Sequence, residues 1–303
     1  MIIFVTGVNG QLGHDVIQEL AKRGHTGVGS DIAAACNRDI KQNYRQLDIT
    51  DKAASEALLR DIAPDAVIHC AAWTDVDAAE EENRRALARA VNAGGTQNMA
   101  DAAKAVDAKL LYLSTDYVFD GQGTVPWKPD DNNIKPLNVY GQTKLEGELA
   151  VASTLDKYFI VRTAWLFGCN GNNFIRAMIN AGKTHDEVRV VNDQAGTPTY
   201  TSDLARLLVD MAETEKYGYY HATNSETEPG KYISRYDFCV EIFKQYGLKT
   251  KVVPVTTEEY GLSKAARPLN SRLDKSKLAE AGFQPLPDWQ DALARYLKEI
   301  GIG

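Results

Sequence analysis

The chain has 303 residues, of which 44% are hydrophobic and 25% charged, and its formal net charge is −7. This length allows a sizeable core and favours one large domain with a smaller one attached. The acidic balance, without any run rich in Lys and Arg, argues against nucleic acid and acidic membrane surfaces as partners.

The first half of the sequence alternates short apolar runs with segments of helical spacing. Strands are expected at residues 2–6, 26–30, 44–47, 66–71, 109–114 and 158–162. Helices are expected between them, at residues 11–23, 52–62, 83–105 and 140–152. This rhythm predicts an α/β fold, a doubly wound parallel sheet of the Rossmann type with helices on both faces.

Beyond about residue 165 the alternation stops and loops rich in Gly, Asn and Pro follow. Further helices are expected at residues 202–213, 234–246 and 287–300. We therefore expect a dinucleotide-binding domain over residues 1–164. Residues 165–303 would form a smaller C-terminal lobe, mainly substrate-binding, with some segments returning to the Rossmann core.

Cellular location and metal content follow from what the sequence lacks. The sequence has no stretch of 18 or more apolar residues, so no transmembrane helix is expected. The apolar first residues predict a strand rather than a signal peptide. We therefore expect a cytoplasmic protein without a membrane partner. The four cysteines and five histidines are dispersed, which predicts reduced thiols and no zinc site. His69, in an apolar run, is expected to be a core residue.

A glycine-rich turn lies between the first strand and the first helix. Residues 6–13 read Thr-Gly-Val-Asn-Gly-Gln-Leu-Gly, a GxxGxxG spacing. Glycine lets the backbone approach a pyrophosphate closely, and the N-terminus of the helix supplies N–H donors, so this turn predicts a bound dinucleotide.

Acidic and small residues follow the next strands. Asp31, after the second strand, can accept hydrogen bonds from the adenosine ribose and repel a 2′-phosphate, which favours NADH, although a solvated loop carboxylate remains the alternative. Asp48 follows the third strand and can meet the adenine, while Asp51 can cap the next helix. Ala71 and Ala72 are small enough for the cofactor to lie close.

Tyr140 and Lys144 stand four residues apart and therefore share one face of the predicted helix. A neighbouring ammonium lowers the pKa of a tyrosine, which suits Tyr140 to proton transfer. Thr115 ends a preceding strand at the carboxyl edge of the sheet, where ligands of such sheets bind. It can hydrogen-bond the substrate carbonyl oxygen that Tyr140 protonates.

At these residues the chain resembles the extended short-chain dehydrogenases/reductases and, more narrowly, the dTDP-4-dehydrorhamnose reductases. The resemblance runs nearly end to end. Family-like runs lie at residues 71–77, 114–121, 162–168, 172–174, 193–199 and 267–273, with Arg-Thr-Ala-Trp-Leu-Phe-Gly at 162–168 as an example. It implies reduction of the 4-keto group of a dTDP-sugar, dTDP-4-dehydro-L-rhamnose, to dTDP-L-rhamnose with NADPH or NADH.

The resemblance also implies a role for each residue. The cofactor-binding residues are expected to be Gly7, Gly10, Gln11, Leu12, Gly13, Asp31, Asp48, Ile49, Ala71, Ala72, Thr74, Ser114, Tyr140 and Lys144. The catalytic residues are expected to be Tyr140, Lys144 and Thr115. The substrate-binding residues are expected to be Thr74, Val76, Thr115, Asp116, Trp165 and Asn173. Trp165 is interpreted as a sugar-stacking platform on the surface of the lobe, with a core aromatic as the alternative.

Alternatives remain open at this point. A sugar-nucleotide epimerase or 4,6-dehydratase would share the fold and the Tyr/Lys pair, but dehydratases carry Glu where this chain has Tyr117. A regulatory subunit resembling that of methionine adenosyltransferase would act without catalysis, yet Tyr140, Lys144 and Thr115 are all present. The resemblance is compatible with a monomer or a homodimer and with Mg²⁺, for which the sequence identifies no ligands.

Overall fold

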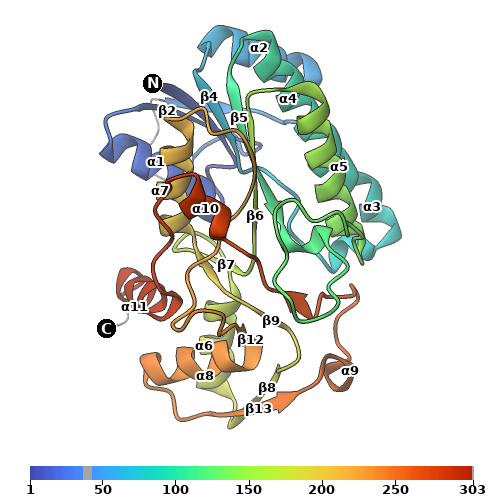
Figure 1. The fold of residues 1–303 in the computed structure, drawn as a ribbon, viewed down its shortest axis with the longest axis vertical. Helices are drawn as coiled ribbons and strands as arrows, with labels where there is room; N and C mark the ends of the chain where they lie inside the picture. The colour runs from blue at the N-terminus through green and yellow to red at the C-terminus, as the bar shows by residue number, and fades with distance from the viewer. Residues whose placement is uncertain (37–42, 302–303) are drawn as a thin grey trace.

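A seven-stranded parallel sheet forms the centre of the protein, in a computed structural model that describes residues 1–36 and 43–301 (Figure 1). The strands are β1 (Ile2–Thr6), β2 (Thr26–Asp31), β3 (Tyr44–Gln46), β4 (Ala66–His69), β5 (Lys109–Thr115), β6 (Tyr158–Thr163) and β11 (Gly218–His221). Their order in space is β11-β6-β5-β4-β1-β2-β3, and every neighbouring pair is parallel. The strand order reverses at β1, which creates a switch point where such sheets bind ligands. The expected doubly wound α/β fold is confirmed.

Helices cover both faces of the sheet. They are α1 (Gln11–Lys22), α2 (Lys52–Ile62), α3 (Glu82–Arg89), α4 (Thr96–Ala105), α5 (Val139–Thr154) and α7 (Thr201–Ala212). Side chains of β1 alternate between the faces: Ile3 and Val5 enter the core cluster beneath α1 and α7. Phe4 enters the cluster beneath α2, α4 and α5. This alternation is what a strand buried on both faces requires.

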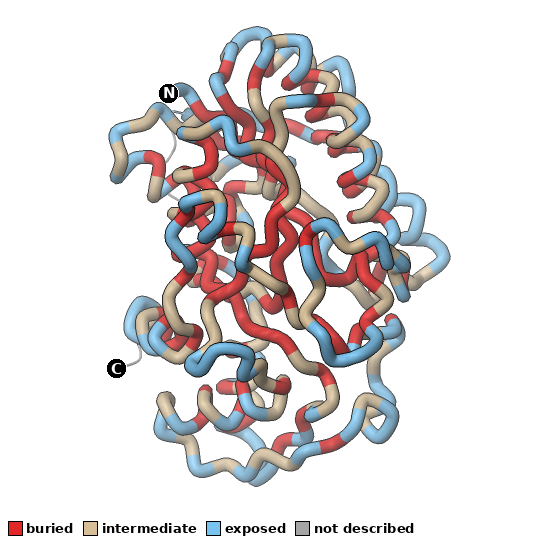
Figure 2. The backbone as a smooth tube through the Cα atoms, in the orientation of Figure 1, coloured by how far each residue is buried: buried red, intermediate tan, exposed pale blue. Residues whose placement is uncertain are grey.

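The C-terminal lobe lies below the sheet in Figure 1 and has a core of its own. Its elements are β7 (Leu166–Phe167), α6 (Phe174–Thr184), β8 (Glu187–Val191), β9 (Ala195–Gly196), β10 (Thr199–Tyr200), β12 (Ile233–Ser234), α8 (Arg235–Tyr246), β13 (Lys251–Val255), α9 (Thr257–Tyr260), β14 (Asn270–Ser271) and α11 (Trp289–Glu299). Figure 2 shows buried backbone running from the sheet into this lobe. Three described segments beyond residue 164 belong to the Rossmann core: α7 packs on α1, β11 pairs with β6, and α10 (Ser276–Glu280) packs on β11. The domain limit at residue 164 stays a prediction.

The helix expected at residues 83–105 is interrupted. It consists of α3, a π-helical segment η3 (Ala90–Gly95) and α4, joined end to end. A π turn inserts one extra residue into the helix and often lies at a functional site. The other helices and strands named from the sequence lie within two residues of their expected bounds.

Two smaller expectations are also met. Asp51 caps α2, because its carboxylate accepts a hydrogen bond from the Ala54 backbone N–H at 2.9 Å. His69 is a buried core residue, hydrogen-bonded to the hydroxyls of Thr6 and Thr96 at 2.7 and 3.2 Å. In the described part of the chain, no helix is long and apolar enough to cross a membrane.

Candidate active site

A cavity of about 910 Å³ opens at the carboxyl ends of β1, β2, β4 and β5, between the sheet and the C-terminal lobe. Every residue expected from the sequence at the cofactor or the substrate lines it: Gly7, Gly10, Gln11, Leu12, Gly13, Asp31, Asp48, Ile49, Ala71, Ala72, Thr74, Val76, Ser114, Thr115, Asp116, Tyr140, Lys144, Trp165 and Asn173. The structure thus brings the whole predicted set together. The role of each residue stays a prediction.

The glycine-rich turn has the shape that a pyrophosphate needs. Gly7 has φ +71°, and a Cβ there would lie 2.8 Å from the Ala71 nitrogen. A Cβ on Gly13 would lie 2.3 Å from the Gly7 carbonyl oxygen, so a side chain at either glycine would force the turn apart. The N-cap of α1 is Gly10, without a side-chain cap, and the first turn carries no acidic residue. No side chain therefore competes for the N–H groups at this end of the helix, which can bind a phosphate. The residues present fit a dinucleotide.

The two acidic residues at the adenosine end are partly engaged by the protein. Asp31 accepts hydrogen bonds from the backbone N–H groups of Asn9 and Ala33, at 3.2 and 3.4 Å. Asp48 accepts from the backbone N–H and the hydroxyl of Thr50, at 2.9 and 2.7 Å. Each carboxylate has further acceptor capacity for ribose or adenine groups.

The segment that follows β4 is clamped to the catalytic helix by Asn92, which lies in η3. Its side-chain amide accepts from the Trp73 N–H at 2.8 Å and donates to the Trp73 carbonyl at 3.1 Å. The same amide donates to the Thr143 hydroxyl at 3.0 Å, between Tyr140 and Lys144 on α5. Asn92 is 1% exposed, and the sequence analysis did not identify it.

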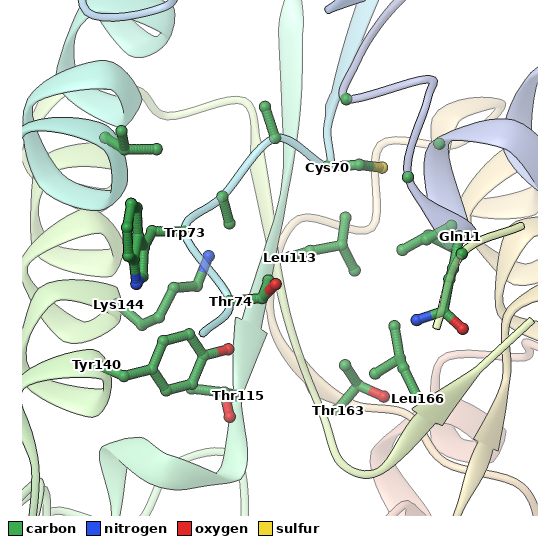
Figure 3. A pocket seen from close by; sticks show the side chains of 18 of the residues that line it. Gln11, Cys70, Trp73, Thr74, Leu113, Thr115, Tyr140, Lys144, Thr163 and Leu166 are labelled. Atoms are coloured by element: carbon green, nitrogen blue, oxygen red, sulfur yellow. The ribbon is translucent and has the colours of Figure 1, made fainter. Parts of the chain in front are cut away.

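Tyr140 and Thr115 lie side by side in the cavity (Figure 3). Burial raises the pKa of Tyr140 above its ordinary value, and a hydrogen bond with the Thr115 side chain opposes this rise. The phenol is therefore protonated at neutral pH, as a proton donor must be. Thr115 itself is 5% exposed and hydrogen-bonds the Asp116 carboxylate at 3.1 Å.

The ammonium of Lys144 lies beside an aromatic ring, 4.2 Å from the ring centroid of Tyr112, and in Figure 3 it extends away from the Tyr140 phenol. The main influences on the pKa of Tyr140 in this arrangement are burial and the Thr115 side chain. That Lys144 lowers the pKa of Tyr140 stays a prediction. Burial lowers the pKa of Lys144 to about 7, although the nearby Glu148 carboxylate opposes the shift.

A buried ion pair supports this end of α5. Glu148 lies one turn after Lys144 and pairs with Arg162 of β6, with its two oxygens 2.9 and 2.7 Å from Nε and Nη2. Ser114, at the end of β5, also donates to Glu148. Both charged side chains are almost fully buried, and their pairing joins β5, β6 and α5 behind the reacting groups.

At the other end of the cavity, Asp116 and Tyr117 meet residues of the lobe. Asp116 is 2% exposed, burial raises its pKa to about 6, and its Oδ2 atom has no hydrogen-bond partner among the described residues. Tyr117 packs edge-on against Tyr140, with ring centroids 5.6 Å apart. Its hydroxyl accepts from Arg267, which also pairs with Asp77 at 2.6 Å.

Two predicted substrate residues are more engaged with protein than expected. Trp165 lines the cavity but is only 9% exposed and belongs to the core of the lobe, so it is not on the open surface as expected. The reason is packing: the Arg235 guanidinium lies 4.0 Å from its ring centroid and Phe238 is stacked at 6.5 Å. Its role as a platform for the sugar stays a prediction. The Asn173 amide donates to Gln11 at 3.1 Å, and also to Gly168 and Tyr296.

Besides Asn92, the sequence analysis missed residues that line the cavity from the side of the lobe. Arg235 and Phe174 line the cavity from the lobe, and Arg235 is the first residue of α8. One signal was available: a cation in the first turn of a helix is electrostatically unfavourable, so it needs a reason.

One group of metal-ligand side chains lies outside the cavity. The ligand atoms of His14, Asp15 and Cys169 lie within 4.8 Å of one another. We assign no ion to this group, because the Asp15 carboxylate already accepts from the Thr201 hydroxyl at 2.5 Å. The N-terminal end of α1, on which His14 and Asp15 lie, also disfavours a cation.

The fold, the glycine-rich turn and the Tyr140/Lys144 pair define the class of the protein: it is an NAD(P)H-dependent oxidoreductase of the extended short-chain dehydrogenase/reductase type. Within this class, the model of the family described as RmlD substrate binding domain matches residues 1–302, and the chain belongs to that family. The resemblance seen in the sequence is confirmed.

Relatives with known names agree with this assignment. The dTDP-4-dehydrorhamnose reductase of Streptomyces griseus is 41% identical over 295 residues, which cover 95% of this chain and 90% of the relative. A crystal structure of such a reductase from Clostridium acetobutylicum is 41% identical with a TM-score of 0.89, covering 99% of this chain and all of the other. The Bacillus anthracis reductase, solved in complex with NADP, is 39% identical with a TM-score of 0.88 and covers 98% of this chain and 99% of its own.

Proposed function

We propose that this protein reduces the 4-keto group of dTDP-4-dehydro-L-rhamnose to give dTDP-L-rhamnose, with Tyr140 as the proton donor. The observation that carries the proposal is that Tyr140 and Thr115 lie side by side in the same cavity as the glycine-rich turn. The names of relatives that are 41% and 39% identical along nearly the whole chain support the choice of substrate.

The chain's own residues would divide the work as follows. Gly10, Gln11 and Leu12 would hold the pyrophosphate of the cofactor, and Lys144 would hold its nicotinamide ribose. The bound nicotinamide supplies the hydride that the 4-keto carbon receives. Tyr140 gives its phenolic proton to the keto oxygen, which becomes the hydroxyl, and Thr115 hydrogen-bonds that oxygen as negative charge develops on it. The phenolate then regains a proton from solvent.

The alternatives, a dehydratase and a non-catalytic regulatory subunit, are less well supported. Elimination would need an acid at the position of Tyr117, but this side chain packs on Tyr140 and accepts a hydrogen bond from Arg267. A non-catalytic regulatory role would leave the intact grouping of Tyr140, Thr115 and Lys144 without a purpose. We therefore favour net reduction with an exchangeable cofactor.

The test is NADPH and NADH oxidation with enzymatically made dTDP-4-dehydro-L-rhamnose, run beside other 4-keto nucleotide sugars. We expect turnover that depends on added cofactor and is fastest with the rhamnose precursor. Tightly bound NAD in equimolar amount in the purified protein, with no net oxidation, would instead point to an epimerase or dehydratase.

The coenzyme and the setting remain parts of the proposal. Asp31 favours NADH, whereas the B. anthracis structure contains NADP, and the ratio of kcat/KM for the two coenzymes decides between them. We expect the enzyme to work in the cytoplasm, as a monomer or a homodimer.

A further inference from the structure

Arg235 is an arginine in an unusual setting. It is the first residue of α8, directly after the N-cap Ser234, and it lines the cavity from the side of the lobe. Its guanidinium lies 4.0 Å from the ring centroid of Trp165 and 5.2 Å from that of Phe174. These two contacts support its charge through cation–π attraction.

The polar groups of Arg235 lack protein partners. In the described residues, the guanidinium makes no hydrogen bond and no ion pair; only its backbone N–H is bonded, to the Gln194 carbonyl. Asp116 and Tyr117 act on it only through space, and burial lowers its pKa to about 10, so it remains charged at neutral pH. The Arg235 side chain is partly exposed to the cavity, and its guanidinium carries five N–H donors that can bind the oxygens of a ligand.

The second arginine of the cavity shows the contrast. Arg267 is neutralised by Asp77 at 2.6 Å and donates to the Tyr117 hydroxyl at 3.2 Å and the Ser263 hydroxyl at 3.2 Å. Among the cavity-lining residues that the structure describes, Arg235 is therefore the guanidinium whose donors stay available to a ligand.

The position of Arg235 indicates which anion. The pyrophosphate of the cofactor is matched by the N-terminus of α1, whereas Arg235 lies with Asp116, Tyr117 and Trp165 at the substrate end. A guanidinium beside two aromatic rings, with its N–H donors unpaired, suits the paired oxygens of a phosphate ester. We propose that Arg235 binds the diphosphate that joins sugar and nucleoside in the substrate. This inference rests on the proposed function, since it takes the substrate to be a nucleotide sugar.

The test measures binding of dTDP and of thymidine to the NADP⁺-loaded protein by calorimetry. In Arg235→Met we expect the affinity for dTDP to fall by about 10- to 100-fold, the effect of losing charge-assisted hydrogen bonds. Thymidine, which has no phosphate, should bind as in the wild type, and so should NADP⁺. Added salt should weaken dTDP binding less in the variant than in the wild type.

Two further variants make the result specific. Arg272→Met is the matched control, because Arg272 also lies near an aromatic ring of the lobe, 5.9 Å from Tyr232, but does not line the cavity. It should bind dTDP normally. Arg235→Lys keeps the charge without the planar fork and should show a smaller loss; if Arg235→Met does not fold, this variant carries the comparison.

A dTDP affinity unchanged in the Arg235 variants, or a loss confined to NADP⁺, would overturn the inference. The proposed function fails separately, if the wild-type protein binds dTDP through Arg235 but reduces no dTDP-4-keto sugar. Conversely, wild-type reduction with normal dTDP binding in Arg235→Met would leave the proposed function intact and remove only the role of Arg235.

Discussion

At the scale of single residues, the protonation state of Tyr140 suits it to donate a proton. Burial raises the pKa of its phenol, so the group holds its proton through the neutral range, and the Thr115 hydroxyl orients it. A reductase needs this protonated state at the start of each turnover, because the substrate oxygen gains a proton. We therefore expect deprotonation of Tyr140 to lower kcat only under strongly alkaline conditions, in a pH profile of kcat.

Tyr140→Phe removes the acid and keeps the ring that packs edge-on against Tyr117. We expect kcat to fall by about 10²- to 10⁴-fold, the usual contribution of a general acid. The dissociation constant for NADPH, measured by fluorescence titration, should change little. Turnover within a few-fold of the wild type would remove Tyr140 from its proposed role.

Lys144 should lower the stability of the folded protein, because its charge is buried, although the residue is needed for activity. Its pKa is lowered by burial to about 7, from 10.5 in an unfolded chain, so the folded state binds fewer protons between these values. Stability should therefore rise with pH between about 7 and 10.5, and the cost of burying the charge is greatest below pH 7. Lys144→Met should remove this cost and raise the melting temperature of the cofactor-free protein by several degrees at pH 6.

The measurement is thermal unfolding of the wild type and of Lys144→Met at several pH values, without cofactor. The variant should lose the rise in stability between pH 7 and 10.5 and should also lose catalytic activity. Lys104→Met is the control, because Lys104 is exposed on α4, and it should change neither property. A Lys144→Met protein less stable than the wild type at pH 6 would contradict the prediction.

At the scale of elements, the π turn η3 connects cofactor binding to the catalytic helix. The extra residue in this turn accompanies a buried Asn92 whose amide spans Trp73 and Thr143. Asn92→Ala would leave the Trp73 N–H and carbonyl without their partner inside the protein. We expect a loss of about 1–3 kcal/mol in the free energy of unfolding and a higher dissociation constant for NADPH.

Asn98→Ala provides the comparison for this prediction. Asn98 lies on α4, and its amide donates to the carbonyls of Ile49 and Thr50 at 2.9 and 3.2 Å, away from Trp73. Its loss should affect stability without a matching rise in the dissociation constant for NADPH. Equal effects of the two variants on that dissociation constant would mean that Asn92 has only a structural role.

How far the sequence predicts these elements depends on whether their pattern is local. The Rossmann strands and helices are periodic, and the glycine turn, Asp31 and Tyr140/Lys144 occupy positions that the sheet topology brings to one edge. The π turn at residues 90–95 is not predictable from the sequence. It lies in an alanine-rich helix, where the spacing of apolar residues does not show one inserted residue. Two-residue strands such as β9 and β14 are likewise too short for any periodicity to show.

The site residues that the sequence did not reveal depend on long-range packing. Trp165 is enclosed because Arg235 and Phe238, about 70 residues later, cover it. Lys144 turns toward Tyr112, on the neighbouring strand β5, and no spacing along α5 can show this. A motif therefore predicts which residues share the cavity better than it predicts which way each side chain points.

At the scale of the whole molecule, the two halves meet where the cofactor is expected to bind. The Gln11 side chain, in the first turn of α1, accepts hydrogen bonds from the Gly168 N–H at 2.8 Å and from Asn173 at 3.1 Å. Asn170 donates to the carbonyls of Asn9 and Gly10, at 2.8 and 3.2 Å. The loop of the lobe thus lies directly on the glycine-rich turn.

This arrangement predicts that cofactor and substrate binding are coupled. The loop leads into α6, whose first residue Phe174 holds the Arg235 guanidinium. NADP⁺ bound at the glycine-rich turn would fix the Gln11 side chain. Through the hydrogen bond between Gln11 and Asn173, it would also fix the residues at the substrate end of the cavity. We expect NADP⁺ to increase the affinity for dTDP by about fivefold or more, and dTDP to increase the affinity for NADP⁺ by the same factor.

The variant Asn173→Ser tests whether the hydrogen bond between Asn173 and Gln11 couples the binding of NADP⁺ and dTDP. Serine keeps a cap for α6, whose N-cap is Asn173, but it is too short to donate to Gln11, Gly168 and Tyr296 as the amide does. The variant should stay folded and bind each ligand alone with similar affinity, while the fivefold coupling falls toward onefold. Calorimetric titrations of dTDP with and without NADP⁺, on both proteins, give the coupling directly. If the coupling persists in Asn173→Ser, the two sites communicate through the sheet instead, by way of the β5 residues Ser114 and Thr115.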